Sequence, residues 1–362
     1  MITRRFFHAA RIMAARFITA DFMAARFLAT PLLAALLLTS LLTVTSCSRQ
    51  EREFHYSLFT FGTLVDITLY GTDQNTADAA FEKLQADFDR YHQQWSPWTQ
   101  GDLASLNAAL QASRRTELPD SLRELVHNSI ELSALTDGYY NPAIGKLINL
   151  WQFHRYEEEG IAPPDVAAIA KLVNSAPSMD DIKIEDGFIS SDNPDVLLNF
   201  GAYAKGFAIE LGLETIKTSG IDNAIINAGG DLGTIGKRGD RPWNIGIRHP
   251  RADNILASVQ LEENESVFTS GDYERVYFHD GKRYHHILDP RTGYPTANAQ
   301  SVTVIHEDPG FADAIATALF VAGSTDWQRI AEKAGARLVM LVDEHGDIHL
   351  TPGMEQRLKI MQ

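Results

Sequence analysis

The second half of the chain is a series of short β-strand patterns separated by Gly- and Asp-rich turns, and this pattern limits the fold more than any other feature. The runs lie at residues 182–191, 224–236, 243–250, 257–271, 274–287, 301–308 and 337–352. Two helical patterns, 203–219 and 311–322, lie among them instead of alternating with single strands. Hairpin-like turns and segregated helices predict an α+β fold, with mixed or antiparallel sheets and packed helices.

The first half combines one β-rich stretch, 56–71, with longer helical patterns. Apolar residues at helical spacing predict helices over 75–95, 122–136 and 163–173. No Pro-, Gly- or Ser-rich linker divides the chain after Tyr56. We therefore expect residues 56–362 to form one compact domain, with two lobes as the alternative.

An almost uncharged apolar run, 27–44, dominates the N-terminus and ends in small residues before Cys47, the only cysteine in the chain. The sequence Val-Thr-Ser-Cys resembles a bacterial lipobox, which predicts a lipoprotein signal peptide over 1–46, lipidation of Cys47 and a polar tether over 47–55. An uncleaved membrane anchor is the alternative. Met-Ala-Ala-Arg-Phe occurs twice, so translation starting at Met23 is a further hypothesis.

The charge balance excludes one class of partner. The chain has a formal net charge of −15, and no basic stripe of the kind that binds nucleic acid is present in the sequence. Negative charge also disfavours electrostatic docking onto anionic lipid. Attachment to a membrane would therefore depend on the lipid anchor.

One helical pattern carries a candidate metal site, Ala-Asp-Ala-Ile-Ala-Thr at 312–317. Asp313 and Thr317 are four residues apart and share one helix face. A carboxylate and a hydroxyl suit a hard cation such as Mg²⁺. The alternative is an Asp that interacts with the helix dipole and a Thr that bonds to its own helical turn.

Two glycine-containing segments could approach a phosphate. Residues 199–206 (NFGAYAKG) open a helical pattern, where N–H groups and Lys205 favour anions. Residues 227–236 (NAGGDLGTIG) either cradle a diphosphate or form an ordinary hairpin with Gly229 and Gly230 at its turn. From the residues alone, both segments keep an ordinary structural explanation.

Adjacent histidines lie in the stretch 282–295 (KRYHHILDPRTGYP). In a strand, His285 and His286 point to opposite faces, so only one of them can line a given pocket. That histidine could be a base or a metal ligand, and an edge strand ending in a turn is the alternative. Residues 289–293 (DPRTG) predict a rigid turn.

Three aromatic residues, Phe61, Trp98 and Tyr140, lie beside predicted turns or loops. A flat ring in such a place can stack on a flat ligand. Aromatic side chains belong more often to the core, and these three could do the same.

In combination and in this order, these segments resemble the ApbE family of bacterial FAD:protein FMN transferases. The shared motifs are FGT at 61–63, TDGYYNPAIG at 136–145, GAYAKG at 201–206, NAGGDL at 227–232, TSGDYER at 269–275, HHILDPRTGYP at 285–295 and ADAIAT at 312–317. The resemblance covers essentially all of the chain that follows the predicted tether. A lipobox is also common in the family.

The resemblance implies a defined activity. Such enzymes bind FAD, split its pyrophosphate with Mg²⁺ and attach FMN through a phosphoester to a threonine of a target protein, releasing AMP. The threonine lies in a Ser/Thr/Gly-rich motif of subunits in Nqr- or Rnf-type redox complexes. The location implied is the periplasmic side of a bacterial membrane, and Ser48 after the lipidated cysteine favours the outer membrane.

The family pattern also assigns roles to residues. It places Mg²⁺ on the Asp313 carboxylate, the Thr317 hydroxyl and the Ala202 carbonyl, and it makes His286 the base that activates the acceptor threonine. Flavin contacts are implied for Phe61, Trp98, Tyr140, Asn141, Asn199, Lys205 and Ile287.

The chain departs from the family pattern at three positions. Phe61 replaces a frequent Met, Asn199 replaces a usual Asp, and Ala316 replaces an additional metal-binding Asp of some members. Two other functions remain alternatives: Mg²⁺-dependent FAD hydrolysis to FMN and AMP, and flavin binding without catalysis. The sequence does not separate transfer from hydrolysis, because the same pyrophosphate site serves a threonine or a water.

Overall fold

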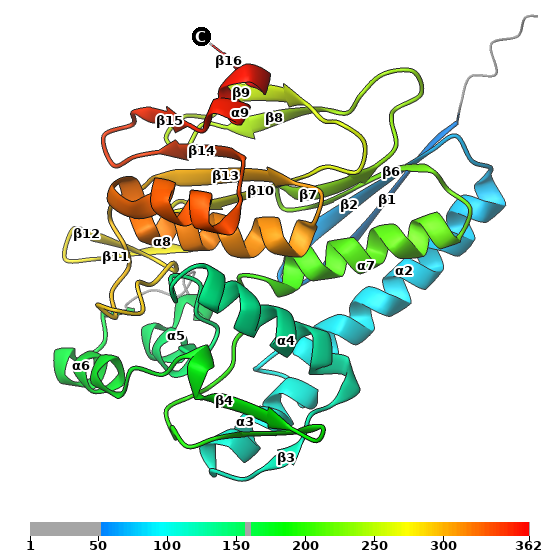
Figure 1. Cartoon of the computed structure of the whole chain (residues 1–362). Coiled ribbons are helices and arrows are strands. Elements are labelled where there is room, and N and C mark those ends of the chain that lie inside the picture. The colour runs from blue at the N-terminus through cyan, green and yellow to red at the C-terminus, as the bar shows by residue number, and fades with distance from the viewer. Residues whose placement is uncertain (1–51, 156–160, 362) are drawn as a thin grey trace, which may run out of the picture. The chain divides into compact units, whose positions relative to one another are not determined.

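The strand patterns of the second half join two N-terminal strands in one antiparallel sheet (Figure 1). The computed structural model describes residues 52–155 and 161–361, and those from Arg52 onward form one compact unit. In sheet order, the eight strands of this part of the chain are β1 (Glu53–Thr60), β2 (Thr63–Tyr70), β6 (Asn223–Ala228), β7 (Asp231–Ile235), β10 (Ser266–Gly271), β13 (Ser301–His306), β14 (Leu338–Val342) and β15 (Ile348–Leu350). The predicted α+β class with antiparallel sheets is confirmed.

Strand alternation explains how β1 and β2 attach to the core. Val65, Ile67 and Leu69 are buried, whereas Leu64, just before them, and Asp66, between the first two, are exposed. Strand β1 begins at Glu53, which pairs with Tyr70 of β2. The predicted polar tether over 47–55 is therefore wrong at its C-terminal end, because its last three residues belong to the sheet.

Three helices cover one face of this sheet (Figure 1). They are α2 (Gln74–Trp95), α7 (Ala204–Thr218) and α8 (Pro309–Ala334). Asp73 and Asp308 cap α2 and α8 by accepting hydrogen bonds from first-turn N–H groups. Helix α8 continues past the predicted end at Ala322, with a kink at Gly323, whose φ is 65°.

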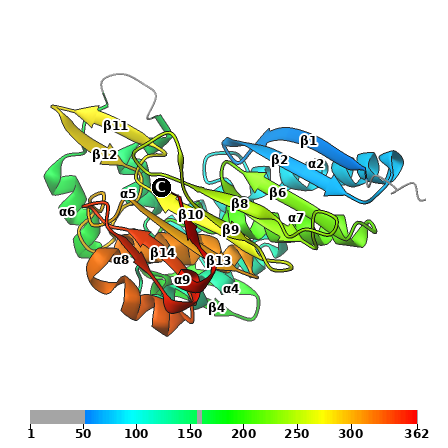
Figure 2. The ribbon, with the colours of Figure 1, turned by 90° about the horizontal axis from the view of Figure 1, so that it is seen from above.

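A smaller sheet packs on the opposite face of the large one (Figure 2). Its strands are β16 (Lys359–Ile360), β9 (Ile255–Gln260) and β8 (Asn244–Arg248). Trp243, Ile247 and Val259 contact Leu232 and Met340 of the large sheet to form a second apolar core.

Most of the remaining elements lie on the helix-covered side of the large sheet, whereas the last helix packs against β14 and β15 (Figure 1). The helices are α3 (Asp102–Gln111), α4 (Asp120–Leu135), α5 (Gly145–Trp151), α6 (Val166–Ser175) and α9 (Pro352–Arg357), with 3₁₀ turns η1 (Phe153–Arg155) and η2 (Met179–Asp181). The strands are β3 (Thr116–Glu117), β4 (Ile182–Glu185), β5 (Phe188–Ser191), β11 (Val276–His279) and β12 (Lys282–His285). Helices α3, α5 and α9 were not predicted from the sequence.

The N-terminal predictions concern another part of the chain. The predicted signal peptide, Cys47 and the first residues of the tether lie outside the described residues. Within 52–155 and 161–361, no helix has both the length and the hydropathy of a membrane span.

Candidate active site

A partly buried ion pair joins the start of α7 to the start of β7. The Lys205 ammonium contacts a carboxylate oxygen of Asp231, whose other oxygen accepts a hydrogen bond from the Thr269 N–H at 2.8 Å. Burial lowers the pKa of Lys205, but the carboxylates of Asp231 and Asp313 outweigh this effect and raise it. Lys205 is therefore a permanent positive charge in a site that already holds two carboxylates.

Asp313 lies next to this pair because α7 and α8 approach very closely. A Cβ atom on Gly206 would lie 2.3 Å from the Pro309 carbonyl oxygen and 2.8 Å from the Asp313 Cβ, so only glycine fits there. The Gly206 N–H donates to the Asp313 carboxylate at 2.9 Å. In a regular helix that N–H would donate to the Ala202 carbonyl, four residues back, which is thus left without its helical partner.

The oxygen atoms around Asp313 fit a hard cation. Burial raises the pKa of Asp313 to about 7, against the lowering effect of Lys205, so the ionised carboxylate needs further positive charge. One helical turn later, the Thr317 hydroxyl hydrogen-bonds the Ser270 hydroxyl at 3.0 Å. Carboxylate, hydroxyl and backbone carbonyl oxygens are donors that Mg²⁺ accepts. Among the described residues, including those of this site, no group of three or more His, Cys, Asp or Glu side chains could hold a metal ion.

The two adjacent histidines are in different environments. His285, the last residue of β12, is buried, and its Nε2 donates to the Thr296 carbonyl at 2.6 Å. Its Nδ1 accepts the Ile287 N–H at 3.3 Å, so both ring nitrogens are occupied. His286 points elsewhere, and its buried Nδ1 has no hydrogen-bond partner among the described residues. His285 is thus used within the protein, whereas His286 keeps an unpaired ring nitrogen, and the expectation that His286 faces a substrate stays a prediction.

His286 is held neutral by its surroundings. Burial, with the positive charges of Arg275 and Lys205, lowers the pKa of His286 to about 3. A neutral imidazole whose nitrogen has no partner is able to accept a proton. An anion bound beside Arg275 and Lys205 would offset the two positive charges and bring that pKa back toward its ordinary value.

The predicted rigid turn after the histidines is confirmed. Asp289 accepts hydrogen bonds from the Arg291 guanidinium at 2.8 and 2.9 Å and from the Arg291 N–H at 2.9 Å. The Gly293 N–H donates to the Asp289 carbonyl at 2.8 Å, and Leu288 pairs with Pro295. This closed loop fixes the backbone that carries His286 and Ile287.

The aromatic residues expected to contact flavin lie in two different environments. Trp98 is 53% exposed, and Phe61 lies at the β1–β2 turn with a φ of 52° and its ring 5.6 Å from that of Phe88. Tyr140 is buried and shares a hydrogen bond of 2.9 Å with Ser129. Its ring is part of the core, and its predicted contact with flavin stays a prediction.

Asn141 and Asn199 shape the loops beside α7. Asn141 donates to the Pro177 carbonyl at 2.9 Å and accepts the Ala143 N–H at 3.0 Å, so its amide is used within the protein. Asn199 accepts the Gly201 N–H at 2.9 Å, while its buried amide nitrogen has no partner within the described chain. A buried unpaired donor fits a ligand acceptor such as a flavin carbonyl. Ile287 is buried in the main apolar core.

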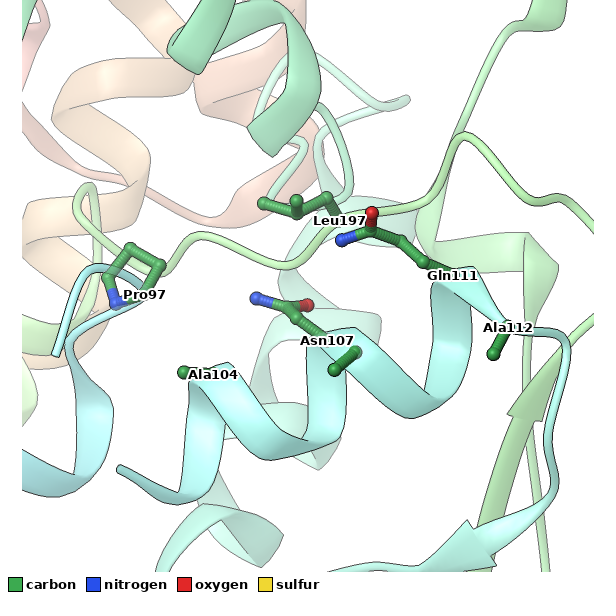
Figure 3. Close-up of a pocket in the computed structure, with 7 residues that line it drawn as sticks. Pro97, Ala104, Asn107, Gln111, Ala112 and Leu197 are labelled. Carbon is green, nitrogen blue, oxygen red and sulfur yellow. The ribbon is translucent and has the colours of Figure 1, made fainter. Parts of the chain in front are cut away.

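A hollow of about 470 Å³ lies along α3 (Figure 3). Asn107, whose side chain points toward Leu197 in Figure 3, exchanges two hydrogen bonds with the Leu198 backbone, at 2.9 and 2.7 Å. Pro97 also lines it, so the hollow borders the segments of Trp98 and Asn199. Both polar atoms of the Asn107 amide are hydrogen-bonded within the protein, so the presence of this residue in the hollow does not require a ligand.

Sequence reasoning missed three residues of this site. Asp231 was considered only as part of a hairpin turn, and Ser270 and Arg275 only as members of a motif. Arg275 contributes to the electrostatics of His286, and a Cβ on Gly62 would lie 3.6 Å from its guanidinium. A carboxylate directly after a Gly-Gly turn was the available signal for Asp231.

A largely buried lysine, oxygen donors for a hard cation and an unpaired histidine form a site that suits chemistry on a phosphate group. The sequence model of the ApbE family matches residues 61–341, and the chain belongs to that family. The chain is 37% identical to the FAD:protein FMN transferase of Rhodobacter capsulatus over 84% of its own length, but it spans only 58% of that relative. It is 32% identical to a FAD:protein FMN transferase of Klebsiella pneumoniae, covering 75% of this chain and 83% of the relative.

Solved structures agree with this assignment. The ApbE protein of Thermotoga maritima superposes with a TM-score of 0.77 at 29% identity, covering 84% of this chain and 99% of the other. The apo flavinyl transferase ApbE of Pseudomonas stutzeri superposes with a TM-score of 0.75 at 26% identity, covering 86% and 98%.

Proposed function

We propose that the protein is a Mg²⁺-dependent FAD:protein FMN transferase. The observation that carries the proposal is the unpaired His286 Nδ1 beside the Lys205, Asp231 and Asp313 cluster. A pure flavin-binding protein has no use for an unpaired base next to a charge-neutralising site. The names of the relatives supply the substrate, FAD, and the product class, a flavinylated protein.

The reaction follows from the side chains. The threonine Oγ of the acceptor protein attacks the FMN phosphorus of FAD, and His286 Nδ1 takes the hydroxyl proton as the new bond forms. The phosphoanhydride bond to AMP breaks, and AMP leaves with the electron pair. Lys205 stabilises the charge that develops on the phosphate oxygens.

The metal would be held by the chain's own oxygen atoms. Asp313, Thr317 and the Ala202 carbonyl would bind Mg²⁺, which neutralises pyrophosphate charge when bound. Asn199 would orient the flavin through its unpaired amide. The exposed ring of Trp98 and the ring of Phe61 would border it, as would Ile287.

The proposed setting is the periplasmic face of a bacterial membrane, with the outer membrane favoured. The chain would be anchored by lipidated Cys47, and its acceptors would be subunits of Nqr- or Rnf-type redox complexes. The lipobox-like sequence supports this proposal. A Cys47→Ser variant should move from the membrane fraction to the soluble fraction, and unchanged membrane retention would contradict the lipid anchor.

One assay separates the three candidate activities. Purified protein is incubated with FAD, Mg²⁺ and a candidate acceptor subunit, and flavin fluorescence of the denatured acceptor is measured. Transfer predicts a fluorescent acceptor and one AMP for each flavin attached. Free FMN and AMP with an unlabelled acceptor would indicate a hydrolase instead. Intact FAD would indicate a binding protein.

A further inference from the structure

A second polar hollow, of about 480 Å³, lies at the turn between β8 and β9. Three of the residues that line it are arginines, Arg248, Arg251 and Arg283, although the chain has a net charge of −15. One lining residue, Asp253, carries a carboxylate. The hollow is therefore a local positive region on an acidic protein.

Two of the arginines are fixed in place by one buried carboxylate. Asp272, which is 6% exposed, accepts two hydrogen bonds from the Arg251 guanidinium at 2.7 and 2.6 Å. It also accepts one from Arg283 at 2.7 Å, and a second Arg283 nitrogen donates to the Asp272 carbonyl. The guanidinium groups are thus oriented before any ligand arrives, which lowers the entropic cost of binding.

The third arginine keeps its donors available. Arg248 is exposed, and its guanidinium lies over the Tyr273 ring, 5.6 Å from the ring centre. Within the described part of the chain, no carboxylate lies within salt-bridge distance of it. Arg248 can therefore form a bidentate pair with a carboxylate from outside.

The segment that follows β10 links the hollow to the proposed catalytic site. Asp272 and Tyr273 directly follow β10, whose Ser270 hydrogen-bonds Thr317. Burial raises the pKa of Glu274, the next residue, and the positive charges of Lys205 and Arg248 both oppose this rise. The pyrophosphate of FAD is already matched by Lys205 and the proposed metal, so an anion at Arg248 would come from another molecule.

We propose that this hollow binds an acidic side chain of the acceptor protein, close in sequence to the threonine that is modified. The inference rests on the proposed transferase function, which requires a protein to present its threonine at His286. Arg248 would pair with the acceptor carboxylate, while Arg251 and Arg283 maintain the positive field around it. The pairing would set the position of the acceptor segment and select among threonines.

The test measures binding and transfer separately. Two fluorescein-labelled Gly/Ser/Thr peptides are compared, one with two Asp residues beside the threonine and one with two Asn residues. Fluorescence anisotropy at low salt, with the full-length protein in detergent and FAD present, gives the two dissociation constants. We expect the Asp peptide to bind about tenfold more tightly than the Asn peptide.

Arg248→Gln should remove this preference, while Arg114→Gln, at an exposed arginine after α3, should keep it. Equal binding of the two peptides to the unaltered protein, or a preference that persists in Arg248→Gln, would overturn the inference. Weakened FAD binding in Arg248→Gln would also overturn it by assigning the hollow to the nucleotide. Failure of the transferase proposal gives a different result, namely selective peptide binding without any flavin on the threonine.

Discussion

At the scale of single residues, the two adjacent histidines show what a strand pattern can and cannot predict. Alternation predicted that only one of them would face the site. Which one depended on Thr296, a residue eleven positions away whose carbonyl binds His285. No local pattern in the sequence encodes that contact, and only the family resemblance pointed to His286.

Acidification should reveal the environment of His286. Its pKa is about 3 in the folded protein and about 6.5 in an unfolded chain, so the unfolded state binds the extra proton between these values. The unfolding free energy is therefore unaffected by this group above pH 6.5, and it decreases as the pH falls toward 3 because the unfolded state binds the proton. Between pH 7 and 5, the unaltered protein should lose up to about 2 kcal/mol more unfolding free energy than His286→Gln. Denaturant titrations at both pH values measure this, and equal losses would contradict the neutral buried imidazole.

Asp231 should contribute to both stability and flavin transfer, although the sequence indicated only a position beside a hairpin turn. Asp231→Asn removes the carboxylate that contacts Lys205 and leaves a largely buried ammonium with less compensation. We expect a loss of about 2 kcal/mol in unfolding free energy, together with slower flavin transfer. Asp192→Asn is the matched control, because Asp192 pairs with Lys183 on the surface. If both variants kept full stability and activity, Asp231 would have no role in the site.

At the scale of elements, the long helices and the β6–β7 hairpin could be predicted, whereas α3 and the strand order could not. The apolar spacing of α2 is regular over its whole length, and Asp73 marks its start. Helix α3 is short and begins after Gly101 without a side-chain cap, so little local signal announces it. Pairing of β2 with β6 joins segments that are far apart in the sequence, and local patterns contain no information about it.

The contact between α7 and α8 is the element-level feature on which the site depends. Gly206→Ala would place a methyl group against the Pro309 carbonyl and Asp313, which would separate the helices. We expect about 1–3 kcal/mol of destabilisation from overpacking and a larger loss of transfer than of FAD binding. Thermal unfolding and the transfer assay measure both effects.

Lys217→Ala serves as the control for that variant, because Lys217 is exposed on the same helix. It should change neither stability nor transfer. Normal transfer by a Gly206→Ala protein that folds stably would show that the position of Asp313 does not depend on the close helix contact.

At the scale of the whole molecule, residues from nearly the full described length converge on one site. Lys205 comes from α7, His286 from the loop after β12 and Asp313 from α8, and the place of Phe61 from the first hairpin beside them stays a prediction. The sequence predicted one compact unit, and the described residues from Arg52 onward form one. The motifs identified from the sequence belong together because the antiparallel sheet and its helices bring their ends to the same place.

The proposed function divides the roles of the residues: His286 acts on the acceptor hydroxyl, while Lys205, Asn199 and Asp313 serve FAD and the metal. The most direct measurement is a paired one on His286→Ala, with FAD binding followed by fluorescence quenching and flavin transfer followed by the mass of the acceptor. The account predicts FAD binding within about twofold of the unaltered protein and a loss of transfer of at least about a hundredfold. His279→Ala, at a histidine on β11, should leave both unchanged. Transfer at the normal rate by His286→Ala, or a parallel loss of FAD binding, would contradict the account.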